Sequence, residues 1–343
     1  MKLTHDISNV RTTHPFAIAR GTTSEHRLLR VKIIDDDGVE GWGEAAPNRF
    51  YGETLDTALG ALERLRPVVE AAQPWHLEDI EVEMNRAIRF NGSVKSAISA
   101  ALHDLAGKRL GIPVYQLWGL DAAKAPLSSF TIAIATDEAQ LRERVAQADQ
   151  YPVLKVKLGT DHDEDIIRIV RDAAPNKVLR VDANAAWTAK FALRMIDVLV
   201  ECGVEYVEQP LPAHDLEGTR FVRERSILPV ICDESCVVAT DIPKLVGVAD
   251  GINLKLSKCG GLREALKMIA TARSHGMLVM AGCMIETSLG ITAAAHLAPL
   301  LDYADFDGAA LLANDPYVGA TIDGGQIKLP SAPGLGVSER APS

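Results

Sequence analysis

The last two thirds of the chain repeat one pattern, a short apolar run followed by an amphipathic stretch. Eight apolar runs begin roughly 23 to 26 residues apart, near residues 127–133, 153–157, 178–182, 204–208, 229–232, 252–256, 277–281 and 303–306. One strand, one helix and two loops fill such an interval, so eight units predict a (β/α)₈ barrel with a missing or altered last helix. An open, doubly wound sheet is the competing fold. It needs a glycine-rich phosphate turn after its first strand, which the sequence lacks.

The N-terminal third has a different pattern. Residues 28–34 and 39–43 read as two strands joined by a turn at Asp37-Gly38. Helical stretches follow at about 54–72, 78–88 and 93–110. Ser93 is placed to cap the start of the last helix, and Gly111 is placed to end it.

Separate blocks of strands and helices are typical of an α+β domain. We therefore predict a capping domain over residues 1–115. The barrel is predicted to span residues 116–319, and the tail, about 320–343, is predicted to return to the capping domain.

Composition limits the classes of partner. The 343 residues carry a formal net charge of −10 and contain no cluster of Lys and Arg, which argues against nucleic-acid binding. No apolar run approaches the length of a membrane span, and the start, MKLTHDISNV, lacks the apolar region of a secretory signal. The five cysteines form no CxxC pair, so we expect buried, reduced thiols. A cytoplasmic protein without membrane or nucleic-acid partners is predicted.

Three carboxylates stand at the ends of three consecutive apolar runs: Asp182, Glu208 and Asp233. Parallel strands place their C-terminal ends on one side of a sheet, so the three side chains are expected to converge. Three oxygen ligands without a His or Cys suit a hard cation such as Mg²⁺. For any one of these acids alone, a helix cap or a surface charge would be the better explanation, and it is the matched spacing of all three that favours a metal site.

Lysines interrupt two of the apolar runs. Lys155 and Lys157 share one face of the second strand, and Lys255 lies in the sixth. Inside a barrel, repulsion within the first pair is expected to lower at least one pKa towards the range of a general base; the alternative is a solvated pair on an exposed face. Strands two and six are opposite in a ring of eight, so Lys157 and Lys255 are expected to face each other. Lys258 is expected in a loop or at a helix start.

Two bases on opposite sides of one carbon are what a racemase or epimerase requires. A lysine alone is too weak to remove a proton next to a carboxylate. A divalent ion on that carboxylate stabilises the enediolate that forms and lowers the barrier by several kcal/mol. The predicted reaction is therefore a metal-dependent, two-base 1,1-proton transfer.

Further polar residues are candidates for binding the substrate. Asp305 and Asp307 share one face after the eighth run, where they could bind an ammonium group or cap a loop. Glu286 could support the site by hydrogen bonding or cap a helix. Arg20, which we place in a loop before the first long strand, could pair with a distal substrate carboxylate or lie on the surface. Thr131, in the first barrel run, completes these candidates. No His lies at a strand end, so a His base is not expected.

Together these residues resemble the enolase superfamily, in its muconate-lactonizing-enzyme subgroup. The motifs that carry the resemblance run in order through nearly the whole chain: GWGEAAP, KVK, DAN, EQP, DES, NLKLSKCGGL and PGLGV. The resemblance implies an α+β cap over a (β/α)₇β barrel that binds Mg²⁺, with Mn²⁺ as a possible substitute. It also implies that Lys157 and Lys255 are the two bases and that Lys155 tunes the first of them.

Within that subgroup the chain is most similar to the dipeptide epimerases, through MIETSLGITAAAH, PFAIARG and the DFD at 305–307. This similarity implies that Asp305 and Asp307 bind the free ammonium group of a dipeptide and that Arg20 binds a glutamate side chain. L-Ala-D-Glu and L-Ala-L-Glu are then the favoured substrates, which implies a part in recycling murein peptides. Barrel enzymes of this kind often assemble, which leaves a homo-oligomer possible.

Three other interpretations remain open. Related epimerases act on hydrophobic or cationic dipeptides. An o-succinylbenzoate synthase or a muconate cycloisomerase would use similar acids and lysines, but its substrate carries no ammonium group to balance Asp305 and Asp307. A non-catalytic binding protein would have no use for two opposed lysines and three metal ligands.

Overall fold

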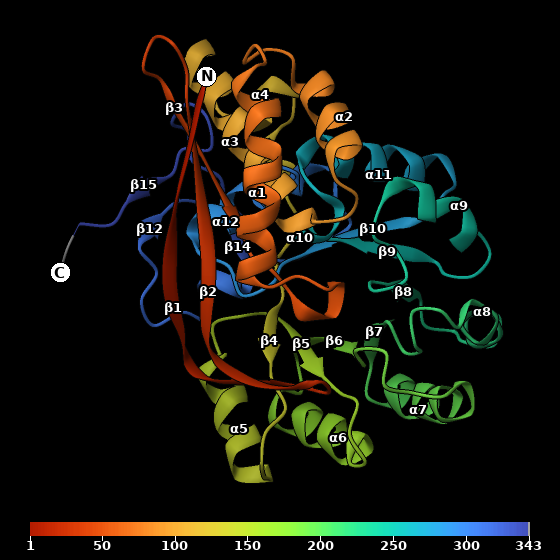
Figure 1. The fold of residues 1–343 in the computed structure, drawn as a ribbon. Coiled ribbons are helices and arrows are strands. Elements are labelled where there is room, and N and C mark those ends of the chain that lie inside the picture. The colour runs from red at the N-terminus through yellow and green to blue at the C-terminus, as the bar shows by residue number, and fades with distance from the viewer. Residues whose placement is uncertain (342–343) are drawn as a thin grey trace.

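The computed structural model describes residues 1–341, which form a barrel and a smaller capping part (Figure 1). Within these residues, eight parallel strands follow one another round the barrel in the order β11-β10-β9-β8-β7-β6-β5-β4. They are β4 (Phe130–Ile132), β5 (Val153–Lys157), β6 (Val178–Asp182), β7 (Val204–Glu208), β8 (Val230–Cys232), β9 (Gly251–Leu254), β10 (Leu278–Gly282) and β11 (Tyr303–Asp305). The two edges meet where Ser129 N donates to Ala304 O at 3.0 Å. The predicted barrel under an α+β cap is confirmed.

Helices cover the outside of the barrel. They are α5 (Glu138–Gln147), α6 (Asp163–Ala173), α7 (Ala189–Glu201), α8 (Leu216–Arg223), α9 (Ile242–Leu245), α10 (Leu256–Cys259), α11 (Leu262–Ser274) and α12 (Ser288–Ala295). Short 3₁₀ turns are η1 (Arg49–Tyr51), η2 (Ala122–Lys124), η3 (Ala239–Asp241), η4 (Ala298–Leu300) and η5 (Asp307–Ala309). All five residues of β5 are buried, because helices cover one face and the barrel interior covers the other. This is why the strands read as continuous apolar runs.

Local capping explains where several helices start. The Asp137 side chain accepts a hydrogen bond from Gln140 N at 2.9 Å at the start of α5, and Asp215 does the same for Gly218 N at 2.8 Å at the start of α8. Such caps satisfy backbone N–H groups that have no partner inside the helix.

The capping part combines a three-stranded antiparallel sheet with helices. Its elements are β1 (Lys2–Ile18), β2 (Gly21–Ile34), β3 (Glu40–Ala45), α1 (Leu55–Glu70), α2 (Leu77–Ala87), α3 (Gly92–Leu110) and α4 (Val114–Leu117). The three predicted helices are present. The prediction that Ser93 caps α3 is wrong, because the helix begins one residue earlier after Asn91 and Ser93 instead donates a hydrogen bond to Glu53. Gly111 ends α3 in the left-handed conformation (φ 71°), as predicted.

The β1–β2 hairpin is the element that sequence patterns missed. Most of β1 is exposed, so it shows no clear alternation of apolar and polar residues. Arg20 therefore lies at the tip of a long hairpin, and its predicted place in a loop before the first long strand is wrong. Figure 1 shows the hairpin passing β4 and bending towards β5 and β6. Near its tip, Ala17 O accepts a hydrogen bond from Ile134 N at 3.1 Å, which ties the hairpin to the barrel.

The C-terminal tail packs against both parts: Ser128 N of the barrel donates to Gly325 O at 2.8 Å, and later tail residues contact the capping part. It contains β12 (Tyr317–Val318), β13 (Thr321–Asp323), β14 (Gln326–Lys328) and β15 (Ser338–Glu339). Leu335 N donates to the Asp104 side chain at 2.7 Å, and Glu339 pairs with Arg30 at 2.5 Å. Residues 342 and 343 of the predicted tail lie outside the described residues, and the predicted domain boundaries stay a prediction. None of the helices in residues 1–341 is both long and apolar enough to cross a membrane.

Two glycines allow β3 to lie directly on α3. A Cβ atom at Gly43 would stand 2.0 Å from Ala97 O, and one at Gly41 would stand 1.9 Å from Ala101 O. Gly43→Ala is therefore expected to lower the free energy of unfolding by about 2–3 kcal/mol, measured by urea denaturation. The matched control is Gly60→Ala in α1, where a Cβ meets no atom within 4 Å and the substitution is expected to stabilise by about 0.5–1 kcal/mol. Equal unfolding midpoints for the two variants would refute the close approach.

Candidate active site

Three buried carboxylates lie at the carboxyl ends of neighbouring barrel strands. Asp182 and Glu208 are the last residues of β6 and β7 and are register partners, and Asp233 directly follows β8. Their relative exposures are 0%, 0% and 1%. The topology thus brings the three predicted metal ligands to one end of the barrel.

Lys155 and Lys157 point from β5 to these acids. Lys157 Nζ lies 2.7 Å from Asp182 Oδ2, while Lys155 Nζ lies 2.6 Å from Glu208 Oε2 and 2.9 Å from Asp305 Oδ2. Both lysines are buried, so the alternative of a solvated pair is wrong.

Carboxylates, and not the neighbouring lysine, dominate the charge state of Lys155. Burial alone would lower the pKa of Lys155, but the charges of Asp305, Glu208 and Asp182 raise it well above its usual range. The expectation of a lowered pKa is therefore wrong for Lys155, because three carboxylates surround its ammonium group and stabilise the charged form. In the opposite direction, burial and the charge of Asp182 raise the pKa of Glu208 to about 7.

Lys255 and Lys258 hold the third acid. Lys255 follows β9 and its Nζ lies 2.7 Å from Asp233 Oδ2. Lys258 lies in α10, close to the predicted helix start, but it is fully buried and donates to the other Asp233 side-chain oxygen. It also donates to three backbone carbonyls, those of Asp233, Cys236 and Asn253. Its contact with the site was not predicted, since the spacing placed it past the strand end.

Asn253 is a second residue that sequence reasoning missed. Its Nδ2 donates to Glu208 Oε1 at 2.7 Å, and the side chain is buried. Asn253 stands two residues before Lys255, so period-two alternation inside the apolar run was the signal that could have found it. The strand order places β5 and β9 four positions apart in the ring of eight. Lys157 and Lys255 therefore come from opposite walls of the barrel.

The donor set at the strand ends fits a hard divalent cation. Asp182, Glu208 and Asp233 offer carboxylate oxygens only, as Mg²⁺ prefers. Glu208 Oε2 is buried and has no well-aligned hydrogen bond among the described residues, although Lys155 Nζ lies close to it. In the described arrangement the lysines occupy the spaces between the acids, and residues 1–341 contain no ready-made cluster of three ligating side chains.

Asp305 and Asp307 lie at the end of β11 and just after it. Asp305 accepts hydrogen bonds from Lys155 Nζ and from Ser129 Oγ, the latter at 2.7 Å. Asp307 Oδ2 accepts from Thr131 N at 2.6 Å. Burial and the charge of Asp305 raise the pKa of Asp307 to about 7. Lys155 bridges Asp305 and Glu208, which links Asp305 to the proposed metal acids.

Arg20 reaches the barrel mouth from the hairpin tip. Its Nη1 donates to Glu234 Oε1 at 2.6 Å and to Asn184 O at 3.1 Å, while its side chain stays 34% exposed. Glu286 is buried in the loop after β10, where it accepts from Met284 N at 3.0 Å. Thr287, and not Glu286, caps α12. Burial raises the pKa of Glu286 to about 7.

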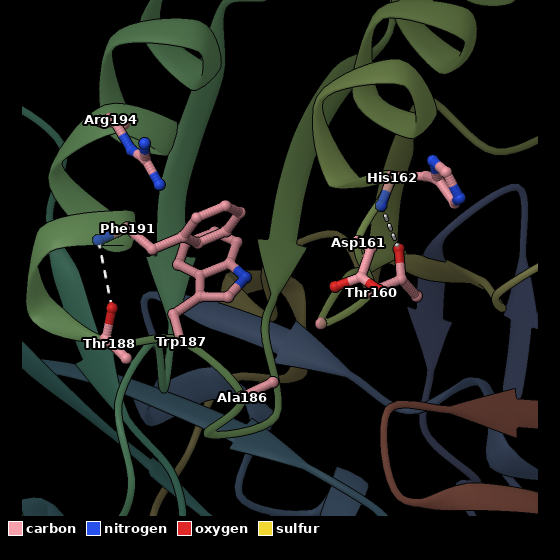
Figure 2. Close-up of a pocket in the computed structure, with 9 residues that line it drawn as sticks. Thr160, Asp161, His162, Ala186, Trp187, Thr188, Phe191 and Arg194 are labelled. Carbon is pink, nitrogen blue, oxygen red and sulfur yellow. Dashed lines mark hydrogen bonds between the residues drawn. The ribbon is translucent and has the colours of Figure 1, made fainter.

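A separate cavity of about 630 Å³ lies beside this cluster, between the loops that follow β5 and β6. Figure 2 shows Trp187, Phe191 and Arg194 on one side and Thr160 to His162 on the other. None of the candidate lysines or carboxylates lines it. The site chemistry is therefore concentrated inside the barrel mouth and not in this surface cavity.

Both parts of the chain match known families. Residues 2–119 match the family described as "Mandelate racemase / muconate lactonizing enzyme, N-terminal domain". Residues 137–341 match the family described as "Enolase C-terminal domain-like".

Individual relatives are similar over nearly the whole chain. The L-Ala-D/L-Glu epimerase of Bacteroides thetaiotaomicron is 38% identical over 98% of this chain and 88% of its own length. The L-Ala-D/L-amino acid epimerase of Maribacter sp. is 39% identical over 95% of each chain. Among solved structures, the dipeptide epimerase of Enterococcus faecalis with Mg and L-Leu-L-Tyr superimposes with a TM-score of 0.94 at 34% identity, over 98% of this chain and 99% of the other.

Proposed function

Since this chain belongs to the mandelate racemase / muconate lactonizing enzyme family of the enolase superfamily, we propose that it epimerises the C-terminal residue of a dipeptide. L-Ala-D-Glu and L-Ala-L-Glu are the favoured substrate pair. The observation that carries the proposal is the placement of Lys157 and Lys255 on opposite walls of the barrel, each beside a different acid.

Mg²⁺ is the proposed cofactor, with Mn²⁺ able to replace it. Asp182, Glu208 and Asp233 would hold the ion, because they present oxygen ligands from three adjacent strands. When bound, the ion supplies positive charge to the substrate carboxylate and so makes the adjacent α-proton more acidic.

The two lysines divide the proton transfer between them. One lysine, neutral at the start, takes the α-proton from one face and becomes charged. The other, charged at the start, delivers a proton to the opposite face and becomes neutral. In the reverse reaction the roles exchange, which is why both walls need a base. Lys155 stays charged among Asp305, Glu208 and Asp182. Through its ion pairs with Glu208 and Asp305 it orients the side chains on the wall that carries Lys157.

Recognition of the dipeptide involves groups at the rim. Asp305 and Asp307 would bind the free ammonium group, since both are buried acids and only Asp305 forms an ion pair with a lysine, Lys155, among residues 1–341. Thr131 and Glu286 position this rim, the first by fixing Asp307 through its backbone N–H. Arg20, at the hairpin tip, would contact the side chain of the C-terminal residue.

The test is proton NMR in D₂O with Mg²⁺ and L-Ala-L-Glu or L-Ala-D-Glu. Loss of the Glu α-proton signal together with appearance of the other epimer is the expected result. Exchange with hydrophobic or cationic dipeptides alone would keep the mechanism and remove glutamate as the substrate. No exchange with any dipeptide would favour a cycloisomerase or synthase instead.

A further inference from the structure

An ion pair between a half-exposed arginine and a buried glutamate stands where the substrate side chain is proposed to bind. Arg20 donates to Glu234 Oε1 at 2.6 Å, and its guanidinium lies 4.4 Å from the centre of the Phe50 ring. The Glu234 side chain has no exposed surface, whereas that of Arg20 is 34% exposed. Glu234 also directly follows Asp233 in the chain. It is therefore part of the barrel mouth, and Arg20 closes over it from the capping part.

We propose that Glu234 is a specificity-determining residue, which offsets the charge of Arg20 so that neutral side chains compete with glutamate at this position. The inference rests on the proposed function, because it concerns the side chain of the epimerised residue.

Arg20 and Glu234 can each form further hydrogen bonds while they remain paired. Within residues 1–341, Nη1 is the Arg20 nitrogen that has hydrogen-bond acceptors, and a guanidinium carries donors on two further nitrogens. Glu234 Oε2 is buried and lacks a hydrogen-bond partner in the same residues. A substrate carboxylate can therefore bind Arg20 without displacing Glu234. The free Glu234 oxygen can accept a hydrogen bond from a substrate amide or ammonium group.

The balance between the charges of Arg20 and Glu234 then determines which substrate side chains are preferred. The pair Arg20–Glu234 has no net charge, so a substrate carboxylate is attracted by one member and repelled by the other at similar distance. A neutral side chain loses little from this cancellation. Arg20 without Glu234 would select anionic side chains, and Glu234 without Arg20 would select cationic ones.

The test compares the natural protein with Glu234→Gln, Arg20→Gln and the double variant. Each is assayed with L-Ala-L-Glu, L-Ala-L-Gln and L-Ala-L-Lys in the presence of Mg²⁺, both for kcat/KM of α-proton exchange and for Kd by calorimetry. Glu234→Gln is expected to raise the preference for Glu over Gln by about tenfold or more. Arg20→Gln is expected to raise the preference for Lys over Gln by a similar factor. The double variant is expected to lose charge preference.

Exposed charges of the capping part provide matched controls. Arg49→Gln and Glu25→Gln remove the same charges from exposed positions and are expected to leave the ratios within about twofold. If Glu234→Gln lowers the preference for Glu, the residue only positions Arg20 and the proposal is overturned. Unchanged ratios in Arg20→Gln also overturn it, even if Glu234→Gln does not fold. If the Kd values follow the expected charge preferences but no dipeptide exchanges its α-proton, the proposed epimerase activity is rejected and the proposed role of Glu234 is kept.

Discussion

Lys157→Ala and Lys255→Ala are each expected to reduce epimerisation by about 10³-fold, because each removes one of the two bases. Neither variant loses the other base, which comes from the opposite wall of the barrel. Each is therefore expected to exchange the α-proton of one epimer with D₂O without converting it. The two variants should exchange opposite epimers, which NMR with the separate L-Ala-L-Glu and L-Ala-D-Glu substrates measures.

Stability must be measured beside activity, since both lysines neutralise buried acids. In Lys255→Ala the Asp233 carboxylate keeps Lys258, and in Lys157→Ala the Asp182 carboxylate keeps Lys155 at 3.5 Å. Both variants are therefore expected to remain folded, as urea denaturation can check. Lys190→Ala, on an exposed position of α7, is the control for lysine removal. Exchange of both epimers by either variant at the natural rate would eliminate the two-base assignment.

Glu208→Gln is expected to lower epimerisation by at least about 100-fold and to weaken Mg²⁺ binding by about tenfold or more, because a charged ligand is replaced by a neutral one. Calorimetric titration with Mg²⁺ and the D₂O assay measure the two effects. With a chelator present, the free energy of unfolding is not expected to fall. Glu208 and Asp182 are buried register partners whose like charges repel each other, and Gln removes that repulsion.

The same substitution on the same strand gives the control. Glu205 stands near the other end of β7, where it pairs with Arg180 at 2.8 Å. Glu205→Gln is expected to leave Mg²⁺ affinity and epimerisation nearly unchanged. If Glu208→Gln binds Mg²⁺ as tightly as the natural protein, Glu208 is not a ligand.

Much of the barrel could be predicted because its strands are buried on both faces. Continuous apolar runs at even intervals predicted all eight strands. A charged residue at the end of such a run is expected at the barrel mouth, because both faces of the strand are buried. Asp182, Glu208 and Asp233 were therefore found together without knowledge of their contacts. The same logic extended to Lys155, Lys157 and Lys255.

Residues outside that regularity could not be placed in this way. Lys258 lies past a strand end, and its contact with Asp233 depends on how the short helix α10 folds back. Arg20 lies between β1 and the start of β2, and both of these segments are exposed and lack a readable pattern. The partner of Arg20, Glu234, could not be foreseen either, because the contact joins residues 214 positions apart. Long-range pairing of this kind is determined by tertiary packing and leaves no local trace.

The tail that returns to the capping part has a consequence for synthesis on the ribosome. Asp104 in α3 accepts hydrogen bonds both from Trp42 N in β3 and from Leu335 N in the tail, so contacts of elements made early are completed only by a segment made much later. The barrel strands can assemble during translation, whereas the cover that carries Arg20 gains its final contacts only after residue 335 has emerged. A nascent chain is then expected to acquire its fold progressively but its catalytic competence abruptly, once the tail has emerged.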